Sequence, residues 1–108
     1  MMLVAIGTVD GKTMNPEHFG HSNTYLIYEF DGTNFVKKEE RQNPYAKNHL
    51  HAKVDEILEF LGDCKVWVGM SMGKSSKKKL EELGYIPITV DTLEISKALE
   101  LVKTQLQG

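Results

Sequence analysis

Five short stretches of the chain carry the patterning of β-strands, and turn-forming residues separate them. They cover residues 3–9, 24–30, 34–42, 64–70 and 86–90. The first two stretches are rich in β-branched and aromatic residues, and an Asp-Gly pair follows each of them, which is typical of a turn. The third stretch is polar along one side, so we expect it at an edge of the sheet.

Three other segments repeat apolar residues at three- and four-residue spacing, which predicts amphipathic helices. Gly62 and Gly84 mark the ends of the first two, and Asp91 with Glu94 is a predicted capping pair at the start of the third. The apolar positions are Leu50, Val54, Ile57, Leu58 and Leu61 in the first helix, Leu80 and Leu83 in the second, and Ile95, Leu99, Val102 and Leu106 in the third.

The resulting element order, βββαβαβα, predicts an α/β fold with a five-stranded mixed sheet. Hairpins make the first three strands antiparallel to their neighbours, and right-handed helical crossovers make the fourth and fifth parallel to their predecessors. The predicted strand order is 3-2-1-4-5, with only the second strand opposing the others. Since 108 residues suffice for one core and contain no linker or repeat, residues 1–108 are expected to form a single domain.

Four histidines, in two segments, are predicted to gather at one end of this sheet. The first strand runs toward the loop that holds His18 and His21, and the third strand runs toward the connection that holds His49 and His51. Imidazole is the commonest metal ligand and, when protonated, pairs with anions, so these four residues are candidate metal ligands. The alternative is structural: His18 or His21 completes a turn, and His49 and His51 are solvated residues at a helix entry.

The fourth strand delivers a glycine-containing turn to the same end. This turn consists of Gly69, Met70, Ser71, Met72, Gly73 and Lys74, and it opens the second helix. Backbone N–H groups at a helix start attract anions, and Lys74 adds a positive charge, so the turn is a candidate cofactor-binding segment. It is not a nucleotide-triphosphate loop, because that motif needs glycine where this chain has Val68. Met70 and Met72 either offer thioether sulfur to a ligand or fill gaps in the packing.

The single cysteine is predicted to lie away from the histidines. Cys64 begins the strand 64–70, which at about 3.3 Å per residue places its sulfur roughly 20 Å from the histidine end. At that position Cys64 is expected to be a small buried side chain and not a ligand that acts together with the histidines. One cysteine cannot form an internal disulfide, so the fold is expected to rest on its core in a compartment that preserves thiols, which predicts the cytoplasm.

Charge and hydropathy exclude several classes of protein. A net charge of -2 and a pI near 6.1 provide no field that attracts nucleic acid. No apolar run approaches the roughly 18 residues of a membrane span, and the first residues lack the basic leader of a signal peptide. No catalytic nucleophile–histidine–carboxylate spacing is present, so we expect no enzyme. The run Lys77–Lys79 is the solvated face of the second helix or, alternatively, a docking surface for an acidic partner.

Two stretches of the chain resemble the dinitrogenase iron-molybdenum cofactor biosynthesis family. They are VAIGTVDGKTMNPEHFGHSNTYLIYEF, in which His18-Phe19-Gly20 precedes an alternating strand, and CKVWVGMSMGKSSKKKLEELGYIPI. Small stand-alone members of this family have a ribonuclease H-like fold, which the resemblance implies here. The turn GMSMGKSS is bulkier and more basic than the Gly-Gly-aliphatic-Gly pattern of the family.

The resemblance also implies a function related to nitrogen fixation, namely the binding or carriage of an iron-sulfur or iron-molybdenum cluster precursor without turnover. The implied partners are the metal cluster itself and a cofactor-assembly protein. Imidazole can ligate exposed iron. One alternative is a small protein-interaction or regulatory module without metal. Another is a metal-dependent hydrolase, although the first strand lacks the carboxylate that two-metal chemistry needs.

Overall fold

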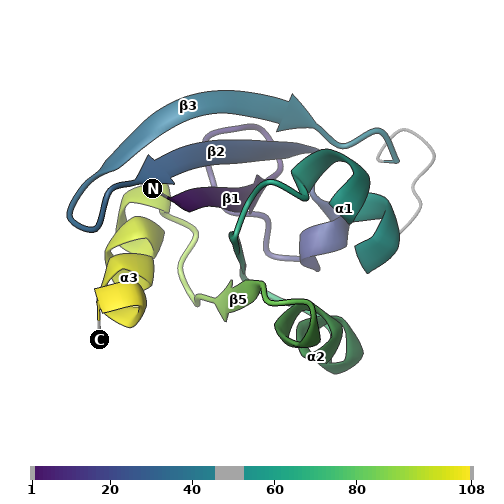
Figure 1. Ribbon diagram of the computed structural model, residues 1–108. Helices are drawn as coiled ribbons and strands as arrows, with labels where there is room; N and C mark the ends of the chain where they lie inside the picture. The colour runs from purple at the N-terminus through teal and green to yellow at the C-terminus, as the bar shows by residue number, and fades with distance from the viewer. Residues whose placement is uncertain (1, 46–52, 108) are drawn as a thin grey trace.

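The strands and helices form in the order that the sequence predicts (Figure 1). The computed structural model describes residues 2–45 and 53–107. The strands are β1 (Met2–Thr8), β2 (Thr24–Phe30), β3 (Phe35–Gln42), β4 (Val66–Gly69) and β5 (Ile86–Thr89); the helices are α1 (Val54–Leu61), α2 (Lys74–Glu82) and α3 (Ile95–Gln107), with a 3₁₀ turn, η1 (Phe19–His21), between β1 and β2. The α/β class is therefore confirmed.

Strand pairing produces one mixed sheet in the order β3-β2-β1-β4-β5. The pairs β1–β2 and β2–β3 are antiparallel, whereas β1–β4 and β4–β5 are parallel. Within the described sheet β2 alone opposes the other strands, and β3 lies at an edge, as predicted. The parallel pairs follow from the helical crossovers, because each helix returns the chain to the end of the sheet where the previous strand began.

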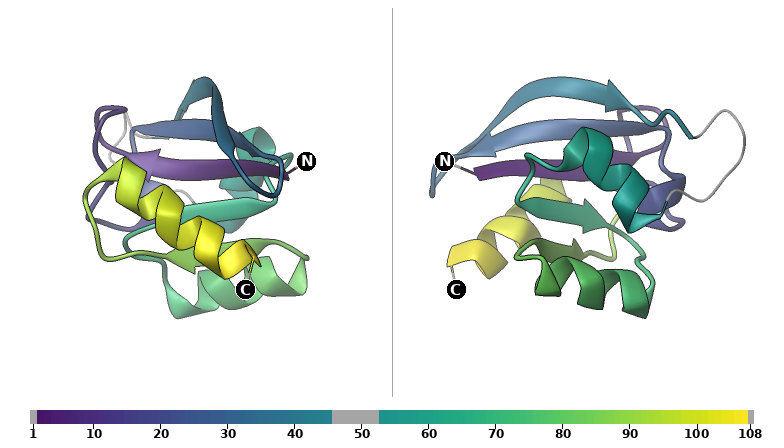
Figure 2. Two further views of the ribbon diagram at one scale, coloured as in Figure 1. Left: turned by 90° about the vertical axis from the view of Figure 1, so that its left-hand side faces the viewer. Right: turned by 45° about the vertical axis from the view of Figure 1, so that its right-hand side comes forward.

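Alternation along β1 sends neighbouring side chains to opposite faces of the sheet. Val4 belongs to an apolar core that α3 covers with Ala98 and Val102. Ala5 belongs to a second core on the side of α1 and α2. Figure 2 shows α3 on one face of the sheet and α1 with α2 on the other. Because helices cover both faces of the central strands, the loops at the ends of these strands are where their polar chemistry meets solvent.

The helices are short, with 8 residues in α1, 9 in α2 and 13 in α3. The first of them starts at Val54, and the Glu56 carboxylate accepts the N–H of Lys53 at 2.9 Å just before it. Leu50, predicted on the apolar face of this helix, lies outside the described residues. None of the helices in the described ranges is long and apolar enough to span a membrane.

The start of α3 differs from the prediction. This helix begins at Ile95, and the Glu94 carbonyl accepts the N–H of Ala98 at 3.0 Å, so Glu94 precedes the first turn of the helix. The predicted capping pair of Asp91 and Glu94 is therefore wrong. The physical reason is tertiary: Thr13 forms an isolated β-bridge with Glu94, and this pairing holds the chain extended up to the helix.

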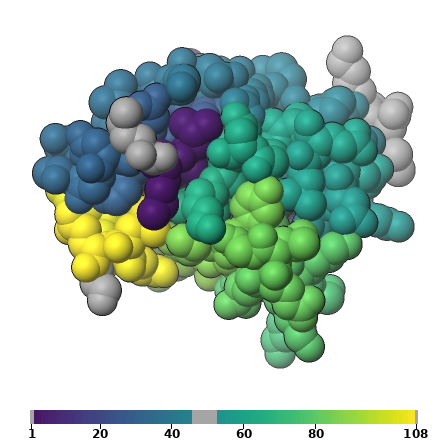
Figure 3. Space-filling view, in the orientation of Figure 1, coloured from purple at the N-terminus to yellow at the C-terminus, as the bar shows by residue number. Residues whose placement is uncertain are grey.

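The far end of α3 packs beside the loop between β2 and β3. Gln107 Nε2 donates a hydrogen bond to the Gly32 carbonyl at 2.9 Å, and Figure 3 shows the last residues of α3, in yellow, next to that blue loop. Gly32 has a φ of 103°, a backbone conformation that favours glycine. The hairpin turn is thus attached to the helix that covers its face of the sheet.

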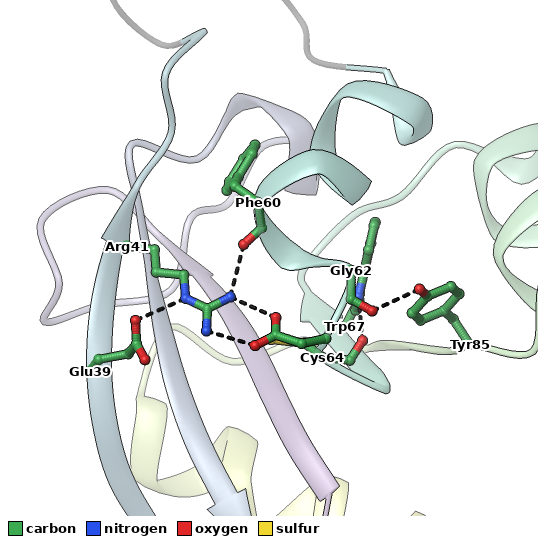
Figure 4. A network of polar contacts seen from close by, with 8 residues as sticks. Glu39, Arg41, Phe60, Gly62, Cys64, Trp67 and Tyr85 are labelled. Atoms are coloured by element: carbon green, nitrogen blue, oxygen red, sulfur yellow. Dashed lines mark hydrogen bonds and ion pairs between the residues drawn. The ribbon is translucent and has the colours of Figure 1, made fainter.

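A guanidinium group ties the edge strand β3 to the end of α1 (Figure 4). Arg41 donates to both carboxylate oxygens of Asp63, at 2.7 and 2.9 Å, and to the Phe60 carbonyl at 2.8 Å. Its Nε donates to Glu39 at 2.9 Å. The hydrogen bonds from Arg41 lower the pKa of Asp63, because they favour the carboxylate over the acid. The bidentate contact therefore holds the sheet edge against the helix.

Cys64 is buried at the end of the sheet where β4 starts (Figure 4). Its side chain is 0% exposed and belongs to the core under α1, which confirms the prediction of a small buried residue. Its carbonyl accepts the Trp67 Nε1–H at 2.9 Å. His18 pairs with Ser71, beyond the other end of β4, so Cys64 and His18 lie at opposite ends of this strand.

Raising the pH is expected to destabilise the fold through Cys64. Burial raises the pKa of this thiol from 9.0 to about 12. At lower pH the thiol is neutral in the folded and the unfolded chain, and its full contribution to stability is present. As the pH rises from about 9 to about 12, the unfolded chain loses the proton while the folded chain keeps it, so the free energy of unfolding falls.

Urea unfolding at pH values from about 8 to about 11 measures this decline. The Cys64→Ala variant should show a shallower fall than the wild type. Part of the decline should remain in the variant, because burial also raises the pKa of Tyr25. Equal slopes in the two proteins would contradict the assignment to the thiol.

Candidate functional site

Residues 18–21, here called the histidine turn, place one aromatic ring inside the protein and two imidazoles outside. The Phe19 side chain is 4% exposed, and its ring stacks on Trp67 with centroids 5.5 Å apart and an interplanar angle of 14°. His18 and His21, on either side of the buried Phe19-Gly20 pair, are exposed. Burial of the phenyl ring thus directs both histidines toward solvent.

Two glycines make room for the phenyl ring on the sheet. A Cβ atom added to Gly7 of β1 would lie 3.3 Å from Phe19 Cδ1, and one added to Gly69 of β4 would lie 3.2 Å from the same atom. The central strands therefore approach the histidine turn more closely than strands with side chains at these positions could.

Two buried asparagines hold the histidine turn from beneath. Asn15 Nδ2 donates to the His18 carbonyl at 3.2 Å and to the Ser22 hydroxyl at 3.1 Å. Asn43 Nδ2 donates to the carbonyls of Gly20, at 3.1 Å, and Ser22, at 2.8 Å. The two asparagines are 3% and 4% exposed, so water cannot readily replace these hydrogen bonds. One side chain from earlier in the same loop and one from the residue after β3 therefore set the backbone of the turn.

The sequence reasoning missed these asparagines, although they share a signal. Each precedes a proline, and each accepts through Oδ1 the N–H of the residue two positions on, Glu17 at 3.1 Å for Asn15 and Tyr45 at 2.9 Å for Asn43. Proline keeps the residue before it extended, and asparagine readily forms such a turn. The Asn-Pro dipeptide therefore predicts a turn. It does not predict which carbonyl groups accept hydrogen bonds from the asparagine Nδ2, and for Asn43 these carbonyls lie 21 and 23 residues away.

A contact between the loops after β1 and β4 lies next to His18. The Phe19 N–H donates to the Ser71 carbonyl at 2.9 Å, and residues His18 and Ser71 form a parallel β-bridge. The Ser71 hydroxyl oxygen lies 3.2 Å from His18 Nδ1. The two loops thus converge at one end of the sheet, as the strand directions predict.

A small hollow of about 20 Å³ opens beside the histidine turn. His18 and Gly20 line one side of it, and Met72, Gly73 and Ser76, at the start of α2, line another. This volume accommodates about one water-sized group. A larger ligand would therefore lie over the hollow, between the histidine turn and the first turn of α2.

The structure brings together one half of the predicted histidine set. His18 and His21 have ring centroids 6.5 Å apart in an edge-on arrangement. His49 and His51 lie outside the described residues, so their position beside the turn stays a prediction. Among residues 2–45 and 53–107, no group of three or more His, Cys, Asp or Glu side chains is placed to hold a metal ion. This part of the chain offers two imidazoles.

The predicted cofactor-binding segment, residues 69–74, divides between the two sides of the sheet. Met72 lines the hollow beside His18 and packs against the core under α1 and α2. Met70 packs against the α3 core instead. The chain turns after β4, so these two methionines face opposite cores although they are close in sequence. Lys74 is exposed at the first position of α2.

The fold and this site define a small α/β protein with an exposed histidine turn at one end of a five-stranded mixed sheet. The chain matches the family described as "Dinitrogenase iron-molybdenum cofactor" over residues 1–105. It belongs to this family, and the resemblance read from the sequence is confirmed.

The chain also resembles one part of a much longer protein. The chain is 27% identical over 113 residues to the FeMo cofactor biosynthesis protein NifB of Frankia alni. The match covers 98% of this chain and 22% of that protein. The chain therefore spans about a fifth of the length of this curated relative.

Two solved structures share the fold. The crystal structure of PH0822 superposes with a TM-score of 0.74 at 19% identity, covering 96% of this chain and 91% of that one. The NMR structure of TM1290 from Thermotoga, a member of the DUF35 family, gives a TM-score of 0.69 at 18% identity, covering 99% of this chain and 90% of that one. These likenesses support the strand order described above.

Proposed function

We propose that this protein binds or carries an iron-sulfur or iron-molybdenum cofactor precursor without catalysing a reaction. Its family supports a role connected with iron-molybdenum cofactor biosynthesis. The cluster is cargo in this proposal and not a resident cofactor. The observation that carries the proposal is the histidine turn, in which His18 and His21 are exposed on a backbone that buried asparagines hold in place.

The donor set suits a carried cluster better than a single metal ion. A structural transition-metal ion takes about four protein ligands. Iron atoms of a cluster already have sulfide ligands, so His18 and His21 could complete the coordination of exposed iron. His49 and His51 remain candidate ligands of the same cluster. A small number of protein ligands would also let the cluster pass to a partner, for which we propose a cofactor-assembly protein.

The start of α2 supports the binding of an anionic guest. The Gly73 carbonyl accepts the N–H of Lys77 at 3.0 Å, so the helix begins directly beside the hollow. The positive end of the helix dipole and the exposed ammonium group of Lys74 both favour negative charge there. Of the predicted segment 69–74, Gly73 and Lys74 at the start of α2 are therefore proposed to face the cluster across the hollow from His18.

The remaining parts of the proposal concern the fold family and the absence of catalysis. The strand order with an antiparallel β2 supports a ribonuclease H-like assignment. The β1 sequence, MLVAIGT, contains no carboxylate, which argues against two-metal hydrolysis.

We further propose that the protein is cytoplasmic, because the chain has one cysteine. We also propose that it has no nucleic-acid partner, because its net charge is -2.

Anaerobic titration with a synthetic, thiolate-ligated 4Fe–4S cluster tests the proposed function. The wild type should retain iron and charge-transfer absorbance after desalting. Replacement of both His18 and His21 by alanine should reduce the affinity for the cluster on the order of tenfold or more. The loss of a group that only hydrogen-bonds to a metal ligand already lowers metal affinity about tenfold. A matched control is Lys12→Ala/Glu17→Ala, which changes two exposed residues of the same loop.

Three outcomes separate the parts of this proposal. Equal cluster retention by the wild type and the His18→Ala/His21→Ala variant would contradict a role for the histidine turn. Absence of retention by the wild type would contradict cluster binding itself. The variant His49→Ala/His51→Ala tests the predicted ligands outside the described residues, and a loss of affinity there would extend the ligand set.

The basic face of α2 supports protein docking as a second candidate function. Lys78 is exposed on this helix, while Lys79 pairs with Asp55 of α1 at 2.7 Å. An acidic partner would be attracted to such a surface. Capture of a partner that is indifferent to metal and is lost in Lys78→Glu would favour this function over cluster carriage.

A further inference from the structure

We propose that Ser71 is a positioning residue for His18: its hydroxyl oxygen accepts a hydrogen bond from His18 Nδ1–H and thereby presents Nε2 to iron. This inference rests on the proposed function, because it concerns how the same site binds its metal. It assigns to Ser71 a role exerted through the imidazole and not through direct contact with the cluster.

The contact between the two side chains is built into the fold. Ser71 Oγ and His18 Nδ1 lie 3.2 Å apart although the residues are 53 positions apart in the sequence. The backbone bond from the Phe19 N–H to the Ser71 carbonyl, at 2.9 Å, holds the same two segments together. The Phe19 ring stacks on Trp67 and so anchors the backbone directly after His18. The serine hydroxyl is therefore delivered to the imidazole by main-chain and aromatic contacts that do not depend on it.

A hydrogen bond at one imidazole nitrogen determines which of the two nitrogens can bind a metal. A neutral ring carries one N–H, and the hydrogen bond at one nitrogen decides which nitrogen keeps a lone pair for metal. Histidines that bind metal almost always donate their other N–H to an oxygen acceptor. The Ser71 hydroxyl can accept from Nδ1–H or donate to Nδ1; in the proposed role it is the acceptor, which makes Nε2 the nitrogen that would bind iron.

The variant Ser71→Ala removes the acceptor, and Ser71→Thr restores a hydroxyl. Neither change touches the Ser71 carbonyl that accepts the Phe19 N–H, so the fold should persist in both. Ser75→Ala is a matched control, because Ser75 is exposed on the adjacent helix. Amide NMR spectra verify that the histidine turn keeps its conformation.

The first measurement needs no ligand. Two-bond ¹H–¹⁵N correlation spectra of the neutral imidazoles report which nitrogen of His18 carries the proton. The Nδ1–H form should dominate in the wild type, decline in Ser71→Ala, and recover in Ser71→Thr. The Ser75→Ala control should match the wild type.

The second measurement is the affinity for the synthetic 4Fe–4S cluster. It should fall about tenfold in Ser71→Ala and recover in Ser71→Thr. An unchanged tautomer in Ser71→Ala would overturn the proposal. If the affinity for the cluster nevertheless fell in that variant, the result would indicate direct contact between the serine and the cluster. A tautomer shift in a protein that retains no cluster would uphold the Ser71–His18 orientation and overturn the proposed function instead.

Discussion

Replacing Asn43 with alanine is expected to lower the free energy of unfolding by about 2–4 kcal/mol. The amide group of this residue donates to two buried carbonyls, those of Gly20 and Ser22, and accepts the Tyr45 N–H. Alanine leaves all three backbone groups without this partner in a place where the side chain is only 4% exposed. Urea denaturation of the two proteins measures the loss.

The control for this prediction is Asn34→Ala, which removes the same amide group from an exposed hairpin position. That variant should stay within about 0.5 kcal/mol of the wild type. The Asn43→Ala variant should also shift the NMR resonances of His18 and His21, because its amide holds the backbone that carries them. A loss of stability no larger than that of Asn34→Ala would show that the asparagine does not hold the turn.

Replacing Gly7 with alanine is expected to cost about 2–4 kcal/mol, through overpacking and a lost hydrogen bond. The added Cβ would lie 2.4 Å from the Ser22 hydroxyl oxygen, which receives the Asn15 Nδ2–H at 3.1 Å. The same Cβ would lie 3.3 Å from the Phe19 ring. The Ser22 hydroxyl must therefore move, and the hydrogen bond that it accepts is lost. Thermal and urea unfolding both report the change.

The variant Ser22→Ala separates the clash from a general loss of packing. It removes the oxygen that the new Cβ would meet, although the Ser22 Cβ, at 3.3 Å, remains. Gly7→Ala/Ser22→Ala should therefore be more stable than the sum of the two single changes predicts, by about 1 kcal/mol or more. Additive effects would contradict the proposed clash between residues 7 and 22.

The element order and the sheet could be predicted from residue patterning because each signal is local. Alternation in residues 24–30 and the helical spacing of Leu99 and Val102 depend on the faces of a single strand or helix. Strand directions then follow from the connections. The predicted start of the third helix failed for the opposite reason, since a β-bridge between Thr13 and Glu94 outweighs a local capping signal.

The candidate site was predicted in outline and not in its supporting contacts. His18, His21 and the segment 69–74 could be assigned to one end of the sheet from chain direction alone. The division of Met70 and Met72 between two cores could not, because it depends on how the chain turns after β4. The location of His49 and His51 beside this end stays a prediction.

The amino-acid sequence by itself determined the α/β class, the strand order and the end of the sheet at which the first two histidines lie, since periodicity and connection rules act along the chain. Only the tertiary structure decided that Asn15 and Asn43 support the histidine turn and that Ser71 meets His18. The contacts of Asn43 and Ser71 join segments distant in sequence, and the hydrogen bonds of Asn43 are strengthened because folding has removed water from around them.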